Sequence, residues 1–415
     1  MHNFSEASSA LAPSAFASTV AMAMAAPLML AGFALQTAGL SRAKNAAHAV
    51  FGHLFLGAIC LTVFWACGFA LAGGHFFLSA GGPADGDTLS SFFAQATMLV
   101  VAASVPLGAL AERWSLRNFF CYGVFASALL FPVFVHLTSA DGWLSSLGYA
   151  DLAGAGTVHA LGGLCALAGV IVAGPRLGRY GKNNRPLPIP AHNVPLALLG
   201  CLVLCSGWGT FIVGRALGDG DFEGALTAGT VAALAAAGGA LAAAFIVKAR
   251  TGKPDPTIVA NGALGGLVAV SGCATCVSTA TGWIIGAVGG VLVATFVQRL
   301  DRLRVDDPVG AVSVHGVGGL WGVIATGLLA NGAGGVSGLF YGDPARFGAQ
   351  LLGVLVLVIW AFGGSWAFFR VLDRFIPMRV QPMVEVEGLD VPQTGVPGYA
   401  GFQLMSEEAA SHPRW

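Results

Sequence analysis

The sequence carries one pattern twice, as DLAGAGTVHALGGL at residues 151–164 and as DPVGAVSVHGVGGL at residues 307–320. Both copies read D-x-x-G-x-x-x-V-H-x-x-G-G-L, and so many matches in register make a chance repeat improbable. We expect each copy to open a membrane helix, the first entering from one face of the bilayer and the second from the other. The two halves of the chain are then related by inversion, an arrangement typical of transporters with a pathway at the repeat interface.

The composition supports a membrane protein. Of the 415 residues, 56% are hydrophobic and 10% are charged, whereas a soluble domain carries roughly 25% charged residues. The 60 glycines fall largely in apolar stretches, where they let helix backbones approach closely. The net charge of +0 excludes nucleic acid as a partner, because that role needs a basic face.

Long, continuous apolar runs predict an all-α integral membrane protein rather than a barrel, whose strands would be short and alternating. A bilayer core needs about 20 apolar residues per helix. By that length we predict eleven transmembrane helices, made of two five-helix halves as an inverted repeat plus one extra helix. The predicted spans are 14–39, 49–73, 91–111, 118–138, 152–174, 194–215, 225–247, 257–277, 281–299, 309–330 and 347–371.

The positive charges predict the orientation, because Lys and Arg accumulate in cytoplasmic loops. With these spans, 18 of the 20 Lys and Arg residues fall on one side, and the exceptions are Arg215 and Arg346. We therefore expect an extracytoplasmic N-terminus (1–13), a membrane domain (14–371) and a cytoplasmic C-terminal tail (372–415). The near-absence of long loops suggests a bacterial inner membrane. The tail is polar and contains prolines, so disorder and docking beneath the helices both stay open.

The candidate functional residues come from the repeat. His159 and His315 lie at matching positions, and ionisable groups within membrane spans are usually functional. Inversion brings both imidazoles near the bilayer midplane, where they can share a proton and bind a small polar substrate; the alternative is that each only packs against helix backbone. Asp151 and Asp307 stand eight residues earlier and are expected to cap the helices, with cation stabilisation as the alternative for Asp151.

Aromatic residues near the outer ends are candidates for a vestibule. Trp208 and Phe211 lie in Gly207-Trp208-Gly209-Thr210-Phe211, and Trp143 stands close to Asp141. Such rings can attract a cation through their faces, although aromatic residues at membrane interfaces are also common anchors.

An enzyme is not expected. We find no nucleophile motif, phosphate-binding loop or metal cluster. Cys273 and Cys276 have C-x-x-C spacing without a second pair or a nearby His, so we expect no metal and no cofactor.

Several segments resemble the ammonium transporter family, Amt/Rh. These segments are the Asp-x7-His of the fifth span, GALAER at 108–113, HNVPLALLG at 192–200, NGALGGLVA at 261–269, DDPVGAVSVHGVGGLWG at 306–322, and the tail segment EGLD at 387–390 followed by Gly398-Tyr399. The resemblance covers roughly residues 15–400. It implies an eleven-helix protomer, a homotrimer with one pore per protomer, twin pore histidines at His159 and His315, and a tail that meets the PII signalling protein.

The resemblance also implies the activity. The implied activity is that of an ammonium/ammonia channel or transporter, with methylammonium as a further substrate. Such a protein deprotonates ammonium at the outer mouth and passes ammonia along the apolar pore. The dry lumen avoids the cost of moving a bare charge, which is ideally tens of kcal/mol.

The sequence departs from the family at the outer mouth. The family's outer gate has two stacked Phe residues, of which Phe211 fits one, while the other falls on Ala94 or Met98. The recruitment site pairs a Trp with a Ser; the Trp is displaced to Trp143, and the Ser position is Arg215, a permanent positive charge. The family segment FYGG is replaced within Leu35-Gln36-Thr37-Ala38-Gly39.

These departures leave alternatives open. Arg215 can pair with Asp151, Asp219 or Asp141 and leave the mouth neutral, or the recruitment site is lost. In the second case the protein is a non-transporting ammonium sensor that signals through its tail, or a channel for another small neutral solute. Because the His pair is intact, ammonium or ammonia stays the leading substrate.

Overall fold

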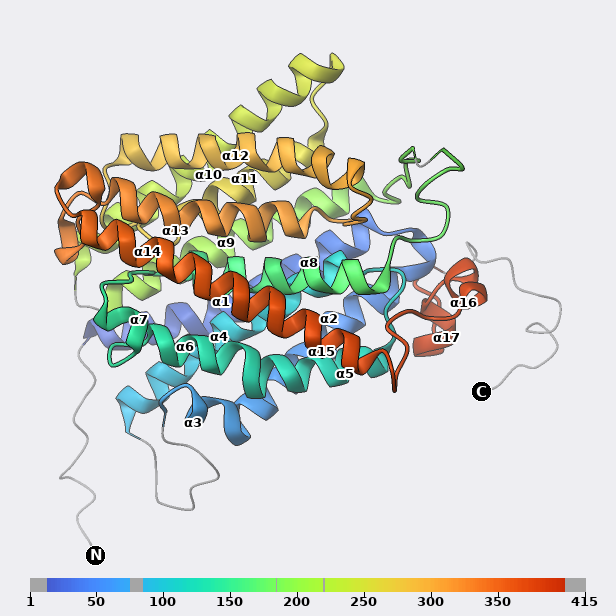
Figure 1. The fold of residues 1–415 in the computed structure, drawn as a ribbon, viewed down its shortest axis with the longest axis horizontal. Coiled ribbons are helices and arrows are strands. Elements are labelled where there is room, and N and C mark those ends of the chain that lie inside the picture. Colours follow the sequence, from blue (N-terminus) through green and yellow to red (C-terminus); the bar gives the residue numbers. More distant parts are fainter. Residues whose placement is uncertain (1–12, 75–84, 184, 219–220, 400–415) are drawn as a thin grey trace, which may run out of the picture.

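The computed structural model describes residues 13–74, 85–183, 185–218 and 221–399. Within these ranges the chain is helical, and the only β-pairing consists of two isolated bridges, Tyr180 with Pro186 and Asn331 with Ser337. Ten helical segments are long and apolar enough to cross a membrane. They lie side by side as one bundle (Figure 1), which confirms the prediction of an all-helical membrane protein.

The ten long segments combine α-helices with tighter or wider turns. They are Pro13–Leu40 (α1), Ala43–Leu71 (with α2, Ala46–Val63, and α3, Phe69–Leu71), Gly86–Ala109 (α4), Leu116–Ser146 (with α5, Leu116–Phe125, α6, Phe131–Thr138, and α7, Trp143–Ser146), Ala155–Ala173 (with α8, Leu161–Ala173), Val194–Gly218 (α9), Phe222–Thr251 (α10), Thr279–Arg302 (α12), Val312–Leu329 (with α13, Gly318–Leu329) and Pro344–Leu372 (with α14, Pro344–Leu357, and α15, Ser365–Leu372).

The eighth predicted span, 257–277, is shorter than expected. Its helix α11 runs over Pro256–Val270 and has 15 residues. The helix stops there because the backbone carbonyls that follow it accept hydrogen bonds from another segment. The carbonyl of Ser271 accepts from Ala153 N (2.8 Å), and that of Gly272 accepts from Leu152 N (3.2 Å). The turn after α11 is therefore joined to the loop that carries Asp151.

The two repeat copies fold alike. Each enters its helix through a glycine with positive φ, Gly154 (+90°) or Gly310 (+77°), and each then forms a π-helical turn, Ala155–Ala160 (η4) or Val312–Val317 (η5). The helices that follow, α8 and α13, run in opposite directions (Figure 1). A Cβ on Gly163 would overlap the backbone of Gly316, so the glycines of the repeat let the two segments touch.

The short helices α16 (Pro382–Glu387) and α17 (Asp390–Thr394) pack at one end of the bundle, on the right in Figure 1. We call this the Asp307 end and the opposite one, where α7 lies, the Asp151 end. Asp390 is fully buried and accepts from His48 N at 2.8 Å, while Gln393 accepts from Leu116 N at 3.0 Å. The tail is thus docked on the bundle up to residue 399, and residues 400–415 lie outside the described part.

Candidate functional site

The centre of the site is a contact between two histidines. His159 on η4 and His315 on η5 lie with their Nδ1 atoms 3.0 Å apart, and their side chains are almost completely buried. A hydrogen bond between two imidazole nitrogens needs one N–H and one lone pair, so one ring donates and the other accepts. The two Nε2 atoms must then have opposite roles, one an acceptor and the other a donor. The repeat thus produces a pair able to accept and donate a proton at once.

Aromatic rings hold the pair from both sides. Trp208 on α9 meets His159 edge to face at 4.2 Å between ring centroids and stacks on Phe211 at 5.0 Å. The indole Nε1 of Trp208 donates to Ser271 Oγ at 2.7 Å, so its N–H is used and the ring is fixed. On the other side Phe33 lies 5.5 Å from the ring of His315.

Two small cavities flank the histidines. The first has a volume of about 20 Å³ and borders both imidazoles, Trp208 and a set of apolar side chains, namely Met29, Phe33, Val101, Leu204, Leu264, Leu267 and Val268. The second has a volume of about 10 Å³ and lies beyond His315, toward the Asp307 end. A water molecule needs roughly 10–15 Å³ of such space. Each cavity therefore suits about one molecule of the size of water or ammonia, and a hydrated ion does not fit.

The two aspartates of the repeat are bound to backbone N–H groups. Asp151 accepts from Gly154 N, Gly156 N and Thr157 N at 2.8–3.1 Å, and from Thr157 Oγ1 at 2.9 Å. Asp307 accepts from Gly310 N (3.1 Å) and Val312 N (2.7 Å). Each carboxylate satisfies the free N–H groups at the start of its π-helical turn, the role of a helix cap. Burial raises the pKa of both, that of Asp307 to about 6, against the lowering effect of these hydrogen bonds.

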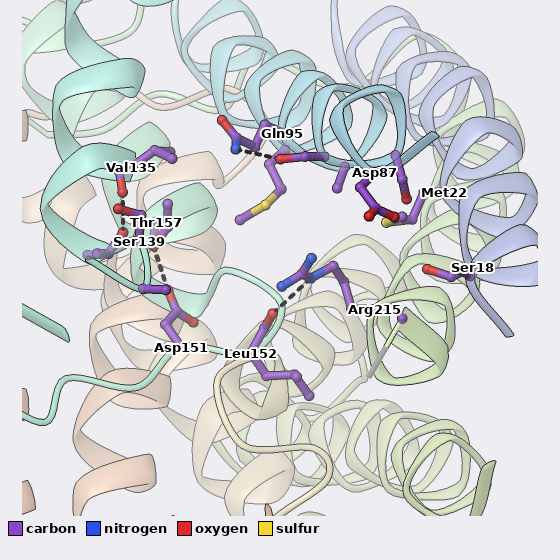
Figure 2. A pocket seen from close by; sticks show the side chains of 18 residues that line it. Ser18, Met22, Asp87, Gln95, Val135, Ser139, Asp151, Leu152, Thr157 and Arg215 are labelled. Atoms are coloured by element: carbon purple, nitrogen blue, oxygen red, sulfur yellow. Dashed lines mark hydrogen bonds between the residues drawn. The ribbon is translucent and has the colours of Figure 1, made fainter. Parts of the chain in front are cut away.

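A wider pocket opens at the Asp151 end, with a volume of about 460 Å³ (Figure 2). Asp151 and Thr157 line it on one side, Met98 and Ala94 contribute from α4, and Arg215 enters from α9. Figure 2 shows the Arg215 side chain reaching the Asp151 loop, where its Nε donates to the carbonyl of Leu152 at 3.3 Å. A positive charge and a half-buried carboxylate thus share the wall of this pocket.

The model of the Ammonium Transporter Family matches residues 17–399. The chain belongs to the ammonium transporter family. Ammonium transporter Amt2 of Archaeoglobus fulgidus is 36% identical over 407 residues, covering 92% of this chain and 87% of the relative. Among solved structures, one titled "Sensor Amt Protein" matches with a TM-score of 0.84 and 30% identity over 92% of this chain and 98% of its own. The crystal structure of Mep2 from Candida albicans matches with a TM-score of 0.76 and 25% identity, over 88% of this chain and 86% of its own.

The family resemblance drawn from the motifs is therefore confirmed. The three aromatic candidates lie at different places in this ammonium transporter family member. Trp143, on the short helix α7, has 51% of its surface exposed and does not line the pocket beside Asp151. Phe211 and Trp208 form a stacked pair next to His159, so the structure brings two of the three aromatic candidates to the site. Asp219, one candidate partner of Arg215, lies outside the described residues.

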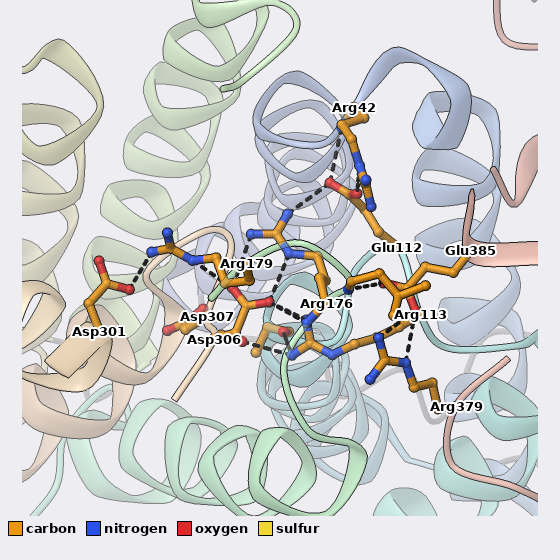
Figure 3. A network of polar contacts seen from close by, with 12 residues as sticks. Arg42, Glu112, Arg113, Arg176, Arg179, Asp301, Asp306, Asp307, Arg379 and Glu385 are labelled. Carbon is orange, nitrogen blue, oxygen red and sulfur yellow. Dashed lines mark hydrogen bonds and ion pairs between the residues drawn. The ribbon is translucent and has the colours of Figure 1, made fainter. Parts of the chain in front are cut away.

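At the Asp307 end, the family member has a buried ion network that sequence reasoning missed (Figure 3). Asp306 accepts from Arg113 Nη1 (3.1 Å) and from Arg176 Nε (2.9 Å), and Arg176 also reaches Glu112 at 2.9 Å. Burial alone would raise the pKa of Asp306, but the hydrogen bonds and charges of Arg176 and Arg113 outweigh it and hold this pKa at about 2. The network ties the ends of α4 and α8 to the turn that starts η5.

The sequence did contain one sign of this ion network: the charged residues Glu112 and Arg113 follow an apolar run, and a second acid, Asp306, precedes Asp307. Their partners lie 64–193 positions away in sequence, so no local pattern pairs them. Cys273 and Cys276 are free and buried, and among the described residues no three His, Cys, Asp or Glu side chains are grouped to hold a metal ion.

Proposed function

We propose that this chain carries ammonium or ammonia across a membrane. Ammonium loses its proton in the pocket beside Asp151, and neutral ammonia passes the His159–His315 pair. The observation that carries this proposal is the Nδ1–Nδ1 contact of 3.0 Å between two buried imidazoles, with a molecule-sized cavity on either side.

The physical argument is the cost of charge in an apolar pore. A bare cation without its water shell pays ideally tens of kcal/mol in such surroundings, whereas neutral ammonia needs only hydrogen-bond partners. The two Nε2 atoms offer one acceptor and one donor, which complement the N–H groups and the lone pair of ammonia. A proton that arrives at the accepting Nε2 lets the same ring pass its Nδ1 proton to the other ring, which then releases a proton from its own Nε2. These three transfers leave both rings neutral and exchange their roles, so the pair also provides a route for the proton.

The proposal extends to the architecture. Helix α11, the eighth span along the chain, also crosses the membrane and raises the number of spans from ten to eleven. The halves that carry η4 and η5 form an inverted repeat, supported by their matching turns and opposite directions. The Asp151 end faces outward and the Asp307 end inward, supported by the positive charges gathered at the latter. The N-terminus is then outside, the C-terminus cytoplasmic, and the membrane a bacterial inner membrane.

Partners follow from the same family membership. The functional unit is proposed to be a homotrimer with one pore per protomer, able to take methylammonium as well. A PII signalling protein is proposed to meet the tail, at α16 and α17, which form a docked surface beneath the bundle. No conversion of the substrate beyond proton transfer is proposed, in line with relatives that are named as transporters.

A second candidate is a sensor that binds ammonium without moving it. The observation in its favour is Arg215, whose positive charge stands in the pocket that would first receive the cation. One similar structure is titled "Sensor Amt Protein". The His159–His315 pair and the two cavities beside it favour transport.

The test uses the purified full-length protein in sealed vesicles. An inward ammonium gradient should change the internal pH within seconds, potassium should give no response, and empty vesicles should respond more slowly. Equal rates in protein-containing and empty vesicles, with correctly inserted protein, would contradict transport. Ammonium binding without flux would then support the sensor. Flux of a neutral solute alone, from a panel that includes small amides, would support a channel for another small neutral solute.

A further inference from the structure

A buried amide pair borders the second cavity, beyond His315. Gln36 on α1 and Asn261 on α11 are 5% and 6% exposed, and Gln36 Nε2 donates to Asn261 Oδ1 at 3.0 Å. Both side chains line the cavity together with His315. Gln36 lies in the segment that differs from the family's FYGG, so this pair distinguishes the chain from the pattern it resembles.

The hydrogen bonds determine which way each amide points. Asn261 Nδ2 donates to the backbone carbonyl of Val309 at 2.8 Å, and a carbonyl only accepts. Asn261 must therefore present its Oδ1 to Gln36, and Gln36 must answer with its NH₂ group. The amide oxygen of Gln36 is left over, and it has no hydrogen bond among the described residues.

The rest of the cavity wall offers few other polar groups, so the amide oxygen of Gln36 is one of the few acceptors for a molecule in this cavity. Apart from His315 and the two amides, the lining side chains are apolar, namely Phe33, Val105, Leu264, Val309, Ala311 and Val314. A carbonyl oxygen among apolar side chains gains from any N–H or O–H donor that reaches it. The space of about 10 Å³ suits one small molecule, and a molecule held there needs polar partners of this kind.

We infer that Gln36 Oε1 is the acceptor of an exit subsite for one small N–H or O–H donor, ammonia or water, on the Asp307 side of the His pair. This inference rests on the proposed function. Ammonia leaving His315 donates one N–H to Gln36 Oε1. The lone pair of the ammonia nitrogen stays free and can take up a proton farther along the pathway. Asn261 and Val309 act as positioning groups, because they fix the orientation of the Gln36 amide.

A transport experiment tests the inference. Gln36→Met keeps the unbranched shape and removes the acceptor, and a lost hydrogen bond of about 1 kcal/mol predicts roughly fivefold lower maximal ammonium flux in vesicles. The matched control is Gln350→Met: Gln350 is also fully buried, but both ends of its amide already bond to Ala150, at 2.7 and 3.1 Å. The control should stay within twofold of wild type. Equal flux for Gln36→Met and wild type, or equal loss in both variants, overturns the inference.

A direct structural readout does not depend on the variant folding or on transport. A high-resolution structure of the wild-type protein should show a peak of water size within about 3.2 Å of Gln36 Oε1. A peak present without ammonium identifies water, and one that appears only with ammonium identifies ammonia. An empty cavity in both conditions overturns the subsite, even if the protein transports ammonium. Wild-type protein that fails to transport contradicts the proposed function instead.

Discussion

The ion network at the Asp307 end gives a prediction that can be worked out in numbers. Asp306 is 2% exposed and is shared by Arg113 and Arg176, which are themselves 0% and 5% exposed. Asp306→Asn removes the charge that faces the buried guanidinium of Arg113 and leaves Arg176 with Glu112 alone. Breaking a buried pair in this way costs about 3–5 kcal/mol. An unfolding entropy of roughly 2.1 cal/mol/K per residue gives about 0.9 kcal/mol/K for this chain. The midpoint of thermal unfolding should therefore fall by about 3–6 °C.

The assay is thermal unfolding of both proteins in one detergent at neutral pH. Asp301→Asn is the matched control, because Asp301 pairs with Arg179 but its side chain is 34% exposed, and partly exposed pairs contribute about 0–1 kcal/mol. Its midpoint should move by about 1 °C or less. Equal midpoints for Asp306→Asn and wild type would refute the view that this network holds the bundle end together.

The pH dependence of stability follows from the same residue. The folded-state pKa of Asp306 is about 2, below the ordinary 3.8, so the folded protein keeps the group charged while the unfolded chain takes up a proton. Its contribution, about 2.5 kcal/mol, is fully present above pH 4 and is lost as the pH falls toward 2. Unfolding midpoints in this window should fall more steeply for wild type than for Asp306→Asn, and parallel curves would contradict the assignment.

Three further substitutions test the pocket and the pore. Arg215→Ser removes one positive charge from the pocket wall and should lower the KM for methylammonium by no more than a few-fold, since a like charge costs at most about 0.5–1 kcal/mol under aqueous screening. A higher KM would contradict repulsion of the cation by this guanidinium. Asp151→Asn has one acceptor oxygen in place of two, so it can keep the bonds from Gly156 N and Thr157 N but loses the one from Gly154 N. The unfolding midpoint should fall only slightly while transport falls strongly; full transport would show that the charge is not needed. Trp208→Phe keeps the stack and loses the bond to Ser271, so it should cost about 1 kcal/mol in thermal unfolding, and no loss would show that this bond is not stabilising.

The sequence predicted the parts of the fold that depend on local pattern. Apolar length located the helices, and the repeated motif identified His159 and His315 as a matched pair. The helix end at Val270 was missed because the apolar run continues to Val277, while the backbone of Ser271 and Gly272 is taken by the Asp151 loop. That competition lies between segments more than a hundred positions apart.

Side-chain partners were the less predictable part. Trp143 stands close in sequence to Asp151, yet the short helix α7 turns it outward. Gln36 and Asn261 meet across 225 positions, and nothing near either residue indicates the other. A single sequence reveals such pairs only when a repeat marks them, as it did for the histidines.

The most direct test of the central claim is the flux of ammonium and potassium through vesicles containing His159→Ala or His315→Ala, measured beside wild type with folding checked by size-exclusion chromatography. The pair predicts that either variant, though folded, loses ammonium flux or admits potassium. Folded variants that both carry ammonium at the wild-type rate and still exclude potassium would contradict it.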